Sequence, residues 1–371
     1  MAASLNEDKR VVLTLDAGGT NFVFSAIQGN KELIAEIIHP SYSDDLDKCL
    51  ESIIHGFEEV KSELTEKICA ISFAFPGPAD YNLGIIGDLP NLGAFRNGVA
   101  LGPLLEDYFQ LPVFINNDGN LFAYGEALTG YLPYINKRLK DAGSIKSYNN
   151  LIGITLGTGF GCGIVIKNIL LTGDNSCGAE IHNTLNKCNP DWNAEESIST
   201  RAIQRVYAVK SGLALSKELM PKDIYDIARS KKNGNQNAAF GSFREFGEAL
   251  GSSIANVLTL IDGIVVLGGG ITAAWDIFAP AMFKEINKNY FNLSGNPYPR
   301  LSFKVFNLED NSTFPEFSSG STKEIRVPKS SRMITYDNIP RTGIGISKSG
   351  ASKAIALGAY AFALHQLDFN K

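Results

Sequence analysis

The chain has 371 residues, of which 44% are hydrophobic and 20% charged, and its formal net charge is −5 at pH 7. This composition is typical of a globular protein and excludes a disordered or membrane-embedded chain, while the length predicts about two domains. The negative charge, with no long basic run to offset it, argues against nucleic acid as the main partner.

The cysteines and the N-terminus bear on the compartment. Five cysteines are too few for a disulfide framework in a chain of this length. The apolar run that follows the polar residues 1–10 is too short for a signal peptide or a membrane-spanning helix. We therefore expect a cytoplasmic protein with no membrane partner.

The first elements in chain order are predicted to be strands. The apolar run Val11–Asp16 ends in the glycine-rich turn Gly18-Gly19-Thr20, as a buried strand followed by a tight turn would. Two β-rich runs, 22–28 and 32–39, flank Gly29-Asn30 and predict a hairpin.

Helices and further strands follow. Apolar residues at spacings of three and four from Leu46 to Val60 predict a helix that Ser43 is placed to cap. The runs 68–75 and 113–115 predict strands, and apolar periodicity returns in 121–128. Alternating strands and helices predict an α/β fold with a mixed sheet covered by helices.

The second half begins with the same pattern as the first. A run at 151–156, the turn Gly157-Thr158-Gly159 and a second run at 162–167 repeat the order of strand, glycine-rich turn and strand. This repeat predicts a duplicated fold, with a polar linker at 131–150. A helix at 243–260 and a strand at 264–267 lead to a third glycine turn, Gly268-Gly269-Gly270.

Two domains follow from this pattern. We expect an N-terminal domain over 1–128 and a C-terminal domain over 129–350, the latter with a long insertion at about 307–349 that is rich in Ser, Pro, Gly and charge. The closing segment 351–371, small and apolar up to residue 364, predicts a helix that packs back on the first domain.

The three glycine-rich turns are candidates for phosphate binding. Glycine lets backbone N–H groups approach phosphate oxygens, and Thr20 and Thr158 add hydroxyl donors. Any single turn of this kind reads equally well as a tight connection. None has the lysine of the Walker pattern, and the glycines of 157–163 precede a strand rather than a helix, which disfavours a dinucleotide fold.

Two carboxylates lie at predicted strand ends. Asp16, beside the first turn, is a suitable ligand for Mg²⁺, directly or through water, although it can also cap the turn. Asp118 follows Asn116-Asn117 and can accept the proton of an attacking hydroxyl in phosphoryl transfer. By itself this second cluster is equally typical of a turn and helix cap.

In their order along the chain, the motifs resemble the ROK family of sugar kinases, which belongs to the actin-like, hexokinase-type ATPase superfamily. The resemblance rests on Asp16-Ala17-Gly18-Gly19-Thr20, Asn117-Asp118-Gly119-Asn120, the turn at 157–159 with Gly161 and Gly163, Gly178-Ala179-Glu180, and Gly268-Gly269-Gly270. It implies duplicated actin-like (ribonuclease H-like) domains with a cleft between them.

The resemblance also implies roles for single residues. Asp118 would be the catalytic base, and Asn117, Gly77 and Asn91 would contact the sugar. Glu180 would bind sugar hydroxyls, as would a second glutamate, Glu195, with Glu196 as the alternative.

One segment departs from the family pattern. The family's sugar-pocket histidine falls on Asn183 without a gap or on His182 with one deletion, and of the family's cysteine loop only Cys188 is present. A structural zinc needs four ligands, so we predict none.

These features predict an ATP- and Mg²⁺-dependent kinase acting on glucose or an N-acetylhexosamine, and the resemblance implies a homodimer. The alternatives are a sugar-responsive transcriptional regulator and a non-catalytic sugar sensor. The regulator would require an N-terminal helix-turn-helix, whereas ten residues precede the first predicted strand. The sensor would not require Asp118.

Overall fold

The computed structural model describes residues 5–18, 20–89 and 93–369. Contacts between residues divide the chain into two compact units. Unit 1 comprises Met1–Pro133, Gly163–Ala179 and Ser347–Lys371, and unit 2 comprises Tyr134–Cys162 and Glu180–Ile346. These units group residues 129–133, 163–179 and 347–350 with residues 1–128. The predicted domain boundaries stay a prediction.

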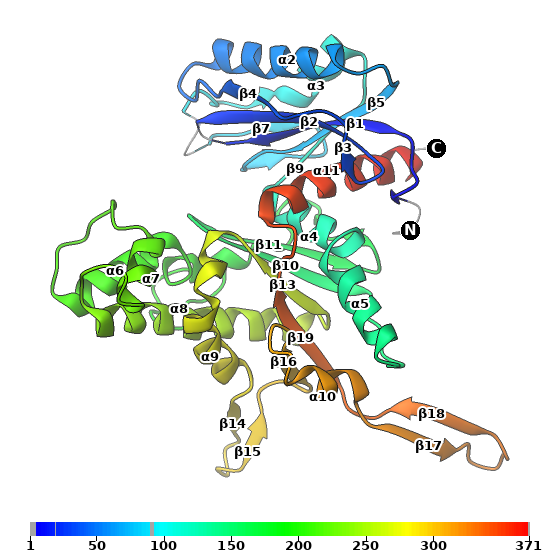
Figure 1. Ribbon diagram of the computed structural model, residues 1–371, viewed down its shortest axis with the longest axis vertical. Coiled ribbons are helices and arrows are strands. Elements are labelled where there is room, and N and C mark those ends of the chain that lie inside the picture. Colours follow the sequence, from blue (N-terminus) through cyan, green and yellow to red (C-terminus); the bar gives the residue numbers. More distant parts are fainter. Residues whose placement is uncertain (1–4, 19, 90–92, 370–371) are drawn as a thin grey trace. The chain divides into compact units, whose positions relative to one another are not determined.

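Unit 1 is built on a mixed six-stranded sheet of order β3-β2-β1-β5-β9, with β4 also paired to β2 (Figure 1). The strands are β1 (Val11–Ala17), β2 (Asn21–Gln28), β3 (Lys31–Glu32), β4 (Ile37–Pro40), β5 (Ile68–Ala74) and β9 (Val113–Asn116). Strands β1, β5 and β9 run parallel. The predicted hairpin is confirmed between β2 and β3, where Gly29 and Asn30 both have positive φ, as a tight two-residue turn requires.

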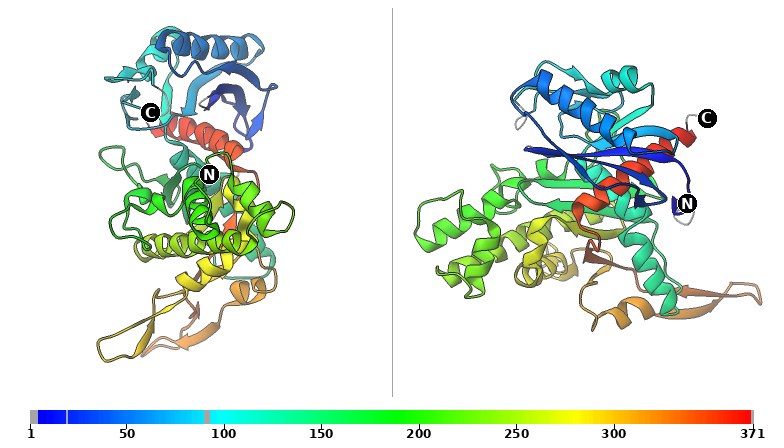
Figure 2. Two further views of the ribbon diagram at one scale, coloured as in Figure 1. Left: turned by 90° about the vertical axis from the view of Figure 1, so that its left-hand side faces the viewer. Right: turned by 45° about the horizontal axis from the view of Figure 1, so that its top comes forward.

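Helices cover both faces of this sheet (Figure 2). They are α2 (Leu46–Ser62), α3 (Leu101–Phe109), α4 (Asp118–Leu128) and α11 (Ala351–Phe369). Short strands β6 (Ala79–Asp80), β7 (Ile85–Ile86) and β8 (Val99–Ala100) form a separate small sheet. Apolar residues of α2 and α3 form one core with the sheet, while α4 and α11 pack on its other face. The predicted cap Ser43 is wrong, because the side chain of Asp45 accepts from the backbone N–H of Lys48 at 3.3 Å.

Helices α4 and α11 pack so closely that only glycine fits at two positions. A Cβ added at Gly125 would lie 2.9 Å from the backbone nitrogen of Gly358, and a Cβ at Gly358 would collide with the carbonyl oxygen of Leu121. This contact holds the C-terminal helix against the helix that begins at Asp118.

The second sheet also has six strands, in the order β12-β11-β10-β13-β19-β16. The strands are β10 (Asn150–Leu156), β11 (Phe160–Ile166), β12 (Ile169–Leu170), β13 (Ile264–Gly268), β16 (Lys304–Asn307) and β19 (Arg341–Ile346). Strands β10, β13, β19 and β16 are parallel to their neighbours. Strand β19 lies within the range predicted as an insertion, and it occupies an inner position of this sheet.

Helices and short 3₁₀ turns complete this half of the chain. The helices are α5 (Tyr131–Asp141), α6 (Thr200–Ser211), α7 (Pro221–Ala228), α8 (Gln236–Leu260) and α9 (Trp275–Ile286), and the 3₁₀ turns are η1 (Ile181–Asn183), η2 (Ala194–Glu196) and η3 (Gly270–Ala274). The segment predicted as a linker therefore contains α5. Across the part of the chain that the structure describes, no helix combines the length and apolar character needed to cross a bilayer.

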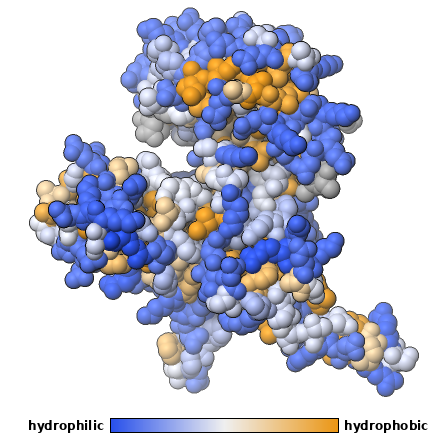
Figure 3. All heavy atoms as spheres, viewed as in Figure 1, coloured by the Kyte–Doolittle hydropathy of each residue, from blue (hydrophilic) through white to orange (hydrophobic). Residues whose placement is uncertain are grey.

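Two hairpins project from unit 2 (Figure 1). They are β14 (Asn289–Phe291) with β15 (Pro297–Pro299), and β17 (Thr322–Arg326) with β18 (Met333–Asp337), the latter preceded by α10 (Phe314–Ser319). Both carry exposed apolar side chains, Phe291 and Met333 among them, so orange and tan atoms appear at their surfaces in Figure 3. The base of the second hairpin is fixed by the buried Arg341, which pairs with Asp337 and donates to the carbonyl of Phe317.

Candidate functional site

The sheet of unit 1 brings several of the predicted residues to one edge. Asp16 on β1 lies opposite Ala74 on β5, which in turn lies opposite Asn116 on β9. Because the three strands are parallel, their carboxyl ends share an edge, where ligands of open α/β sheets commonly bind. Asp16, the turn at Gly77 and the Asn117-Asp118 pair therefore lie along this edge.

The turn between β9 and α4 is fixed by asparagine side chains. Asn117 is the N-cap of α4, and its Oδ1 accepts from the backbone N–H of Asn120 at 2.6 Å. The buried Asn116 accepts from the side-chain amide of Asn120 at 2.9 Å. Asp118 is the first residue of the helix, is exposed, and accepts from the N–H of Gly119 at 2.8 Å. Asn120 belongs to the motif identified in the sequence, but its contact with Asn116 could not be predicted, because a polar side chain one turn into a helix does not reveal its partner.

The first glycine turn is described in part. Gly18 donates its N–H to the carbonyl of Asn21 at 3.0 Å, and a Cβ at Gly18 would lie 2.8 Å from that oxygen. The predicted residues Gly19 and Asn91 lie outside the described residues. Asp16 is exposed at the end of β1, and its carboxylate makes no hydrogen bond or ion pair with the residues that the structure describes. A single carboxylate oxygen donor fits Mg²⁺, which completes its shell with phosphate and water.

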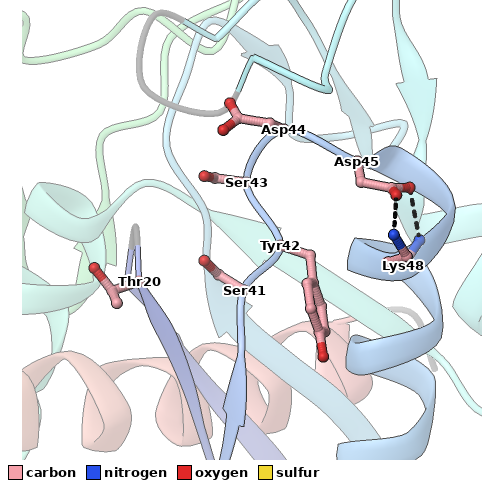
Figure 4. Close-up of a pocket in the computed structure, with 7 residues that line it drawn as sticks. All are labelled: Thr20, Ser41, Tyr42, Ser43, Asp44, Asp45 and Lys48. Carbon is pink, nitrogen blue, oxygen red and sulfur yellow. Dashed lines mark hydrogen bonds and ion pairs between the residues drawn. The ribbon is translucent and has the colours of Figure 1, made fainter.

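A polar hollow of about 410 Å³ lies beside this turn (Figure 4). The hydroxyls of Ser41 and Ser43 point to the side on which Thr20 lies, and the N–H of Ser41 donates to the carbonyl of Thr20 at 3.0 Å. At the rim, Lys48 forms an ion pair of 2.8 Å with Asp45. The remaining lining residues are Tyr42 and Asp44. The hollow thus offers hydroxyl and carboxylate groups beside the first predicted phosphate turn.

In unit 2, the second and third glycine turns are neighbours. Strands β10 and β13 are parallel, with Thr155 opposite Gly268, so the two turns leave adjacent strands at the same edge. A Cβ at Gly157 or Gly270 would meet nothing within 4 Å, which leaves their backbones open to a ligand. Gly269 has φ +93°, and a Cβ there would collide with the carbonyl oxygen of Leu156, so this position requires glycine.

Glu195 lies directly against the turn at 157–159. One carboxylate oxygen accepts from the N–H of Phe160 at 2.9 Å, and the other accepts from Arg201 at 2.8 Å. A Cβ at Gly159 would lie 2.8 Å from the first of these oxygens, so glycine makes the approach possible. Glu196 shares Arg201 with Glu195 and also pairs with Arg205. Glu195, rather than Glu196, therefore lies against this turn, and the assignment of either glutamate to sugar binding stays a prediction.

Glu180 and His182 form a pair. Nδ1 of His182 lies 2.8 Å from a carboxylate oxygen of Glu180, and both side chains are about one-third exposed. The hydrogen bond to Glu180 raises the pKa of His182 above its ordinary value, although burial opposes the change. Asn183 is exposed and ends η1.

No three His, Cys, Asp or Glu side chains are grouped as metal ligands within the described ranges. The expected absence of a structural zinc stays a prediction. Cys188 donates its backbone N–H to the side chain of Asn186 at 2.8 Å, so this loop is organised around an amide.

Comparison with known proteins identifies the family. The model of the ROK family matches residues 12–313. The chain therefore belongs to the ROK family, and its fold is the duplicated actin-like ATPase fold predicted from the sequence.

Its relatives include both enzymes and regulators. The crystal structure of a glucokinase from Parabacteroides distasonis is 50% identical, covers 97% of this chain and 99% of its own, and superimposes with a TM-score of 0.88. A glucokinase from Thermotoga maritima is 25% identical over 296 residues, 75% of this chain and 88% of the relative. A xylose repressor from Bacillus spizizenii is 28% identical over 260 residues, 68% of this chain. The chain spans only 61% of that repressor's length.

Proposed function

We propose that this protein is an ATP-dependent hexose kinase. The observation that carries the proposal is the placement of Asp118, an exposed carboxylate at the start of α4, at the sheet edge that also holds Asp16. The 50% identity to a glucokinase over nearly the whole chain supports it.

Asp118 is assigned the role of general base. A sugar hydroxyl oxygen would attack the γ-phosphorus of ATP, the new O–P bond would form as the bond to the β-phosphate oxygen breaks, and Asp118 would accept the hydroxyl proton as ADP leaves. Asn117 holds the turn that presents Asp118. Mg²⁺, held by Asp16, would neutralise charge on the phosphates.

The other assignments follow the residue types. The backbones of the glycine turns at 18–20, 157–159 and 268–270 are proposed to bind the phosphates of ATP, because successive N–H groups form an anion-binding concavity. Glu180, His182, Asn183 and Glu195 are proposed to bind the sugar, together with Asn117, Gly77 and Asn91. The substrate proposed is glucose or an N-acetylhexosamine, and a homodimer stays a prediction.

The experiment that tests this function is a coupled ADP-release assay over a panel of hexoses and N-acetylhexosamines. Asp118→Asn keeps the shape of the side chain but cannot accept the proton, so kcat is expected to fall about 10²–10⁴-fold with sugar affinity retained. Asp107→Asn, a matched change at an exposed residue of α3 in the same unit, is the control and should leave turnover unchanged. Near-normal turnover in Asp118→Asn would remove this residue from the mechanism.

A second candidate is a sugar-responsive regulator, which the similarity to a xylose repressor favours. If the protein is such a regulator, we expect calorimetry to show that it binds a hexose of the panel, and we expect no ADP release with any sugar of the panel. Turnover that depends on Asp118 would exclude it as the sole function.

A further inference from the structure

The side-chain amide of Asn186 connects several residues of the loop between Glu180 and Glu195 through hydrogen bonds. Asn186 is 5% exposed and lies in the middle of this loop. Its Nδ2 donates to the carbonyl of Asn193 at 2.7 Å and to the hydroxyl of Ser197 at 2.9 Å. Its Oδ1 accepts from the backbone N–H groups of Cys188 and Asn189, at 2.8 and 3.2 Å, and from the hydroxyl of Ser197 at 3.1 Å. Both polar atoms of one buried amide are thus fully used.

These bonds bracket Glu195. Asn193 lies two residues before it and Ser197 two residues after it, and both contact the amide of Asn186. The backbone adds an antiparallel bridge between Leu185 and Asn193, and the N–H of Ala194 donates to the carbonyl of Thr184 at 2.9 Å. The start of the loop, which follows His182, is therefore joined to the turn that carries Glu195.

The charged residue beside Asn186 joins the same loop to the body of unit 2. Lys187 donates to the buried Glu285 on α9 at 2.6 Å. Burial alone would raise the pKa of Glu285, but hydrogen bonds from Lys187 and Lys288 outweigh it and the pKa lies below its ordinary value. Two adjacent side chains therefore fix this loop: Asn186 holds it to the turn around Glu195, and Lys187 holds it to helix α9.

We propose that Asn186 is a positioning residue for sugar binding: its amide holds η2 so that the Glu195 carboxylate stays against the N–H of Phe160, ready to bind a sugar hydroxyl. The proposal rests on the proposed function for the role of Glu195. Its geometric part, the effect of Asn186 on Glu195 and Phe160, stands independently.

The test compares Asn186→Ala with wild type and with Asn189→Ala. Asn189 is a matched control in the same loop. Among the described residues its side chain accepts only the N–H of Asp191, and its bond to Asn186 comes from its backbone. Hydrogen exchange of the unliganded protein reports the geometry directly. We expect peptides covering 157–162 and 193–198 to exchange about tenfold faster in Asn186→Ala, because an opened network exposes their amides, and unchanged exchange in Asn189→Ala.

Kinetics report the consequence for the substrate. A misplaced Glu195 carboxylate would lose its hydrogen bond to the sugar hydroxyl, and losing one hydrogen bond to a charged acceptor weakens binding by about tenfold or more. We therefore expect Asn186→Ala to raise the KM for the sugar by about 10-fold or more, with a smaller change in the KM for ATP. A loss of general stability alone would not separate the two KM values.

A second variant covers the case in which Asn186→Ala does not fold. Asn186→Asp keeps the shape and both acceptor contacts to Cys188 and Asn189, but its ionised form places an oxygen against the carbonyl of Asn193. Protonation restores a donor there, so sugar affinity relative to wild type should recover as the pH falls through the titration of this buried carboxyl.

The outcomes are distinguishable. Exchange and sugar KM within twofold of wild type in a folded Asn186→Ala overturn the inference, as does an Asn186→Asp variant with wild-type sugar affinity at neutral pH. A wild-type protein that phosphorylates no sugar overturns the proposed function instead, and the exchange experiment then decides the role of Asn186 by itself.

Discussion

Replacing Gly358 by alanine tests the packing of α11 against α4. A Cβ at this position would lie 2.7 Å from the carbonyl carbon of Leu121 and 3.0 Å from the backbone nitrogen of Gly125, in addition to its collision with the oxygen of Leu121. All three neighbours are backbone atoms, so no side-chain rotation can relieve the contact. The two helices would have to separate.

The magnitude follows from two opposing effects. Alanine is favoured over glycine in a helix interior by about 1 kcal/mol, whereas overpacking a close contact costs about 1–3 kcal/mol when neighbours can shift and more when backbone must move. We expect a net destabilisation of about 2 kcal/mol or more. For a unit of this size, each kcal/mol lowers the Tm by about 2–4 °C, so the Tm should fall by about 4–8 °C.

Gly241→Ala on α8 is the control with the opposite sign. A Cβ there meets only the flexible side chain of Lys210, at 2.8 Å from its Cδ, so the helix-propensity gain should prevail. Its Tm should be unchanged or slightly raised. Differential scanning calorimetry is the assay, because it resolves the transitions if the units unfold separately.

The same change should affect turnover. Helix α4 begins at Asp118, so displacing α4 moves the proposed base, and kcat should fall even at temperatures where Gly358→Ala is folded. A Tm within about 1 °C of wild type, less than the shift for 1 kcal/mol, would refute the close packing of α11 on α4.

Four further predictions concern charge, backbone and metal. Burial raises the pKa of Glu126 in the folded state. The unfolded state therefore ionises first, and wild type should lose stability as the pH rises above about 4.5. The Tm of Glu126→Gln relative to wild type should increase with pH above this value, and a Tm difference that does not depend on pH would contradict the prediction. The hydrogen bond to Glu180 raises the pKa of His182. The pair therefore stabilises the fold below about pH 6.5, and this stabilisation is lost as the pH rises through the higher folded-state pKa. The Tm of His182→Gln should lie furthest below that of wild type at low pH, which measuring both Tm values across a pH series checks. Gly269→Ala should weaken ATP binding and lower the Tm, because the residue has φ +93° and no room for a Cβ, and calorimetry with normal ATP affinity would argue against the role of this turn. Removing Mg²⁺ should abolish ADP release, whereas elemental analysis that finds one zinc per chain would contradict the prediction of no structural zinc.

Much of the fold could be predicted from the sequence because its signals are local. Apolar runs that end at polar or glycine-rich turns indicated β1, β5, β9, β10 and β13. These turns lie at carboxyl ends of parallel strands, where backbone and side-chain groups can face a ligand. The order of the motifs also identified the family, which the match over residues 12–313 confirms.

Local signals failed where a long-range partner decides the structure. Strand β19 was hidden in a segment rich in Ser, Gly and charge, because its position depends on β13 and β16, which are distant in sequence. The linker predicted at 131–150 contains α5. The cap of α2 is Asp45 rather than Ser43, since either side chain could cap and only the chain's path selects one.

By itself, the sequence determined which groups this protein carries at its strand ends: the carboxylates of Asp16 and Asp118 and the three glycine turns. Only the tertiary structure decided which glutamate approaches the turn at 157–159, because Glu195 and Glu196 are adjacent and chemically identical. It also singled out Asn186, one of several asparagines in its loop, because loop closure surrounds its amide with donors and acceptors from residues up to 11 positions away. The physical reason is that the partners of a buried polar group are set by how the chain returns on itself, which a local pattern does not encode.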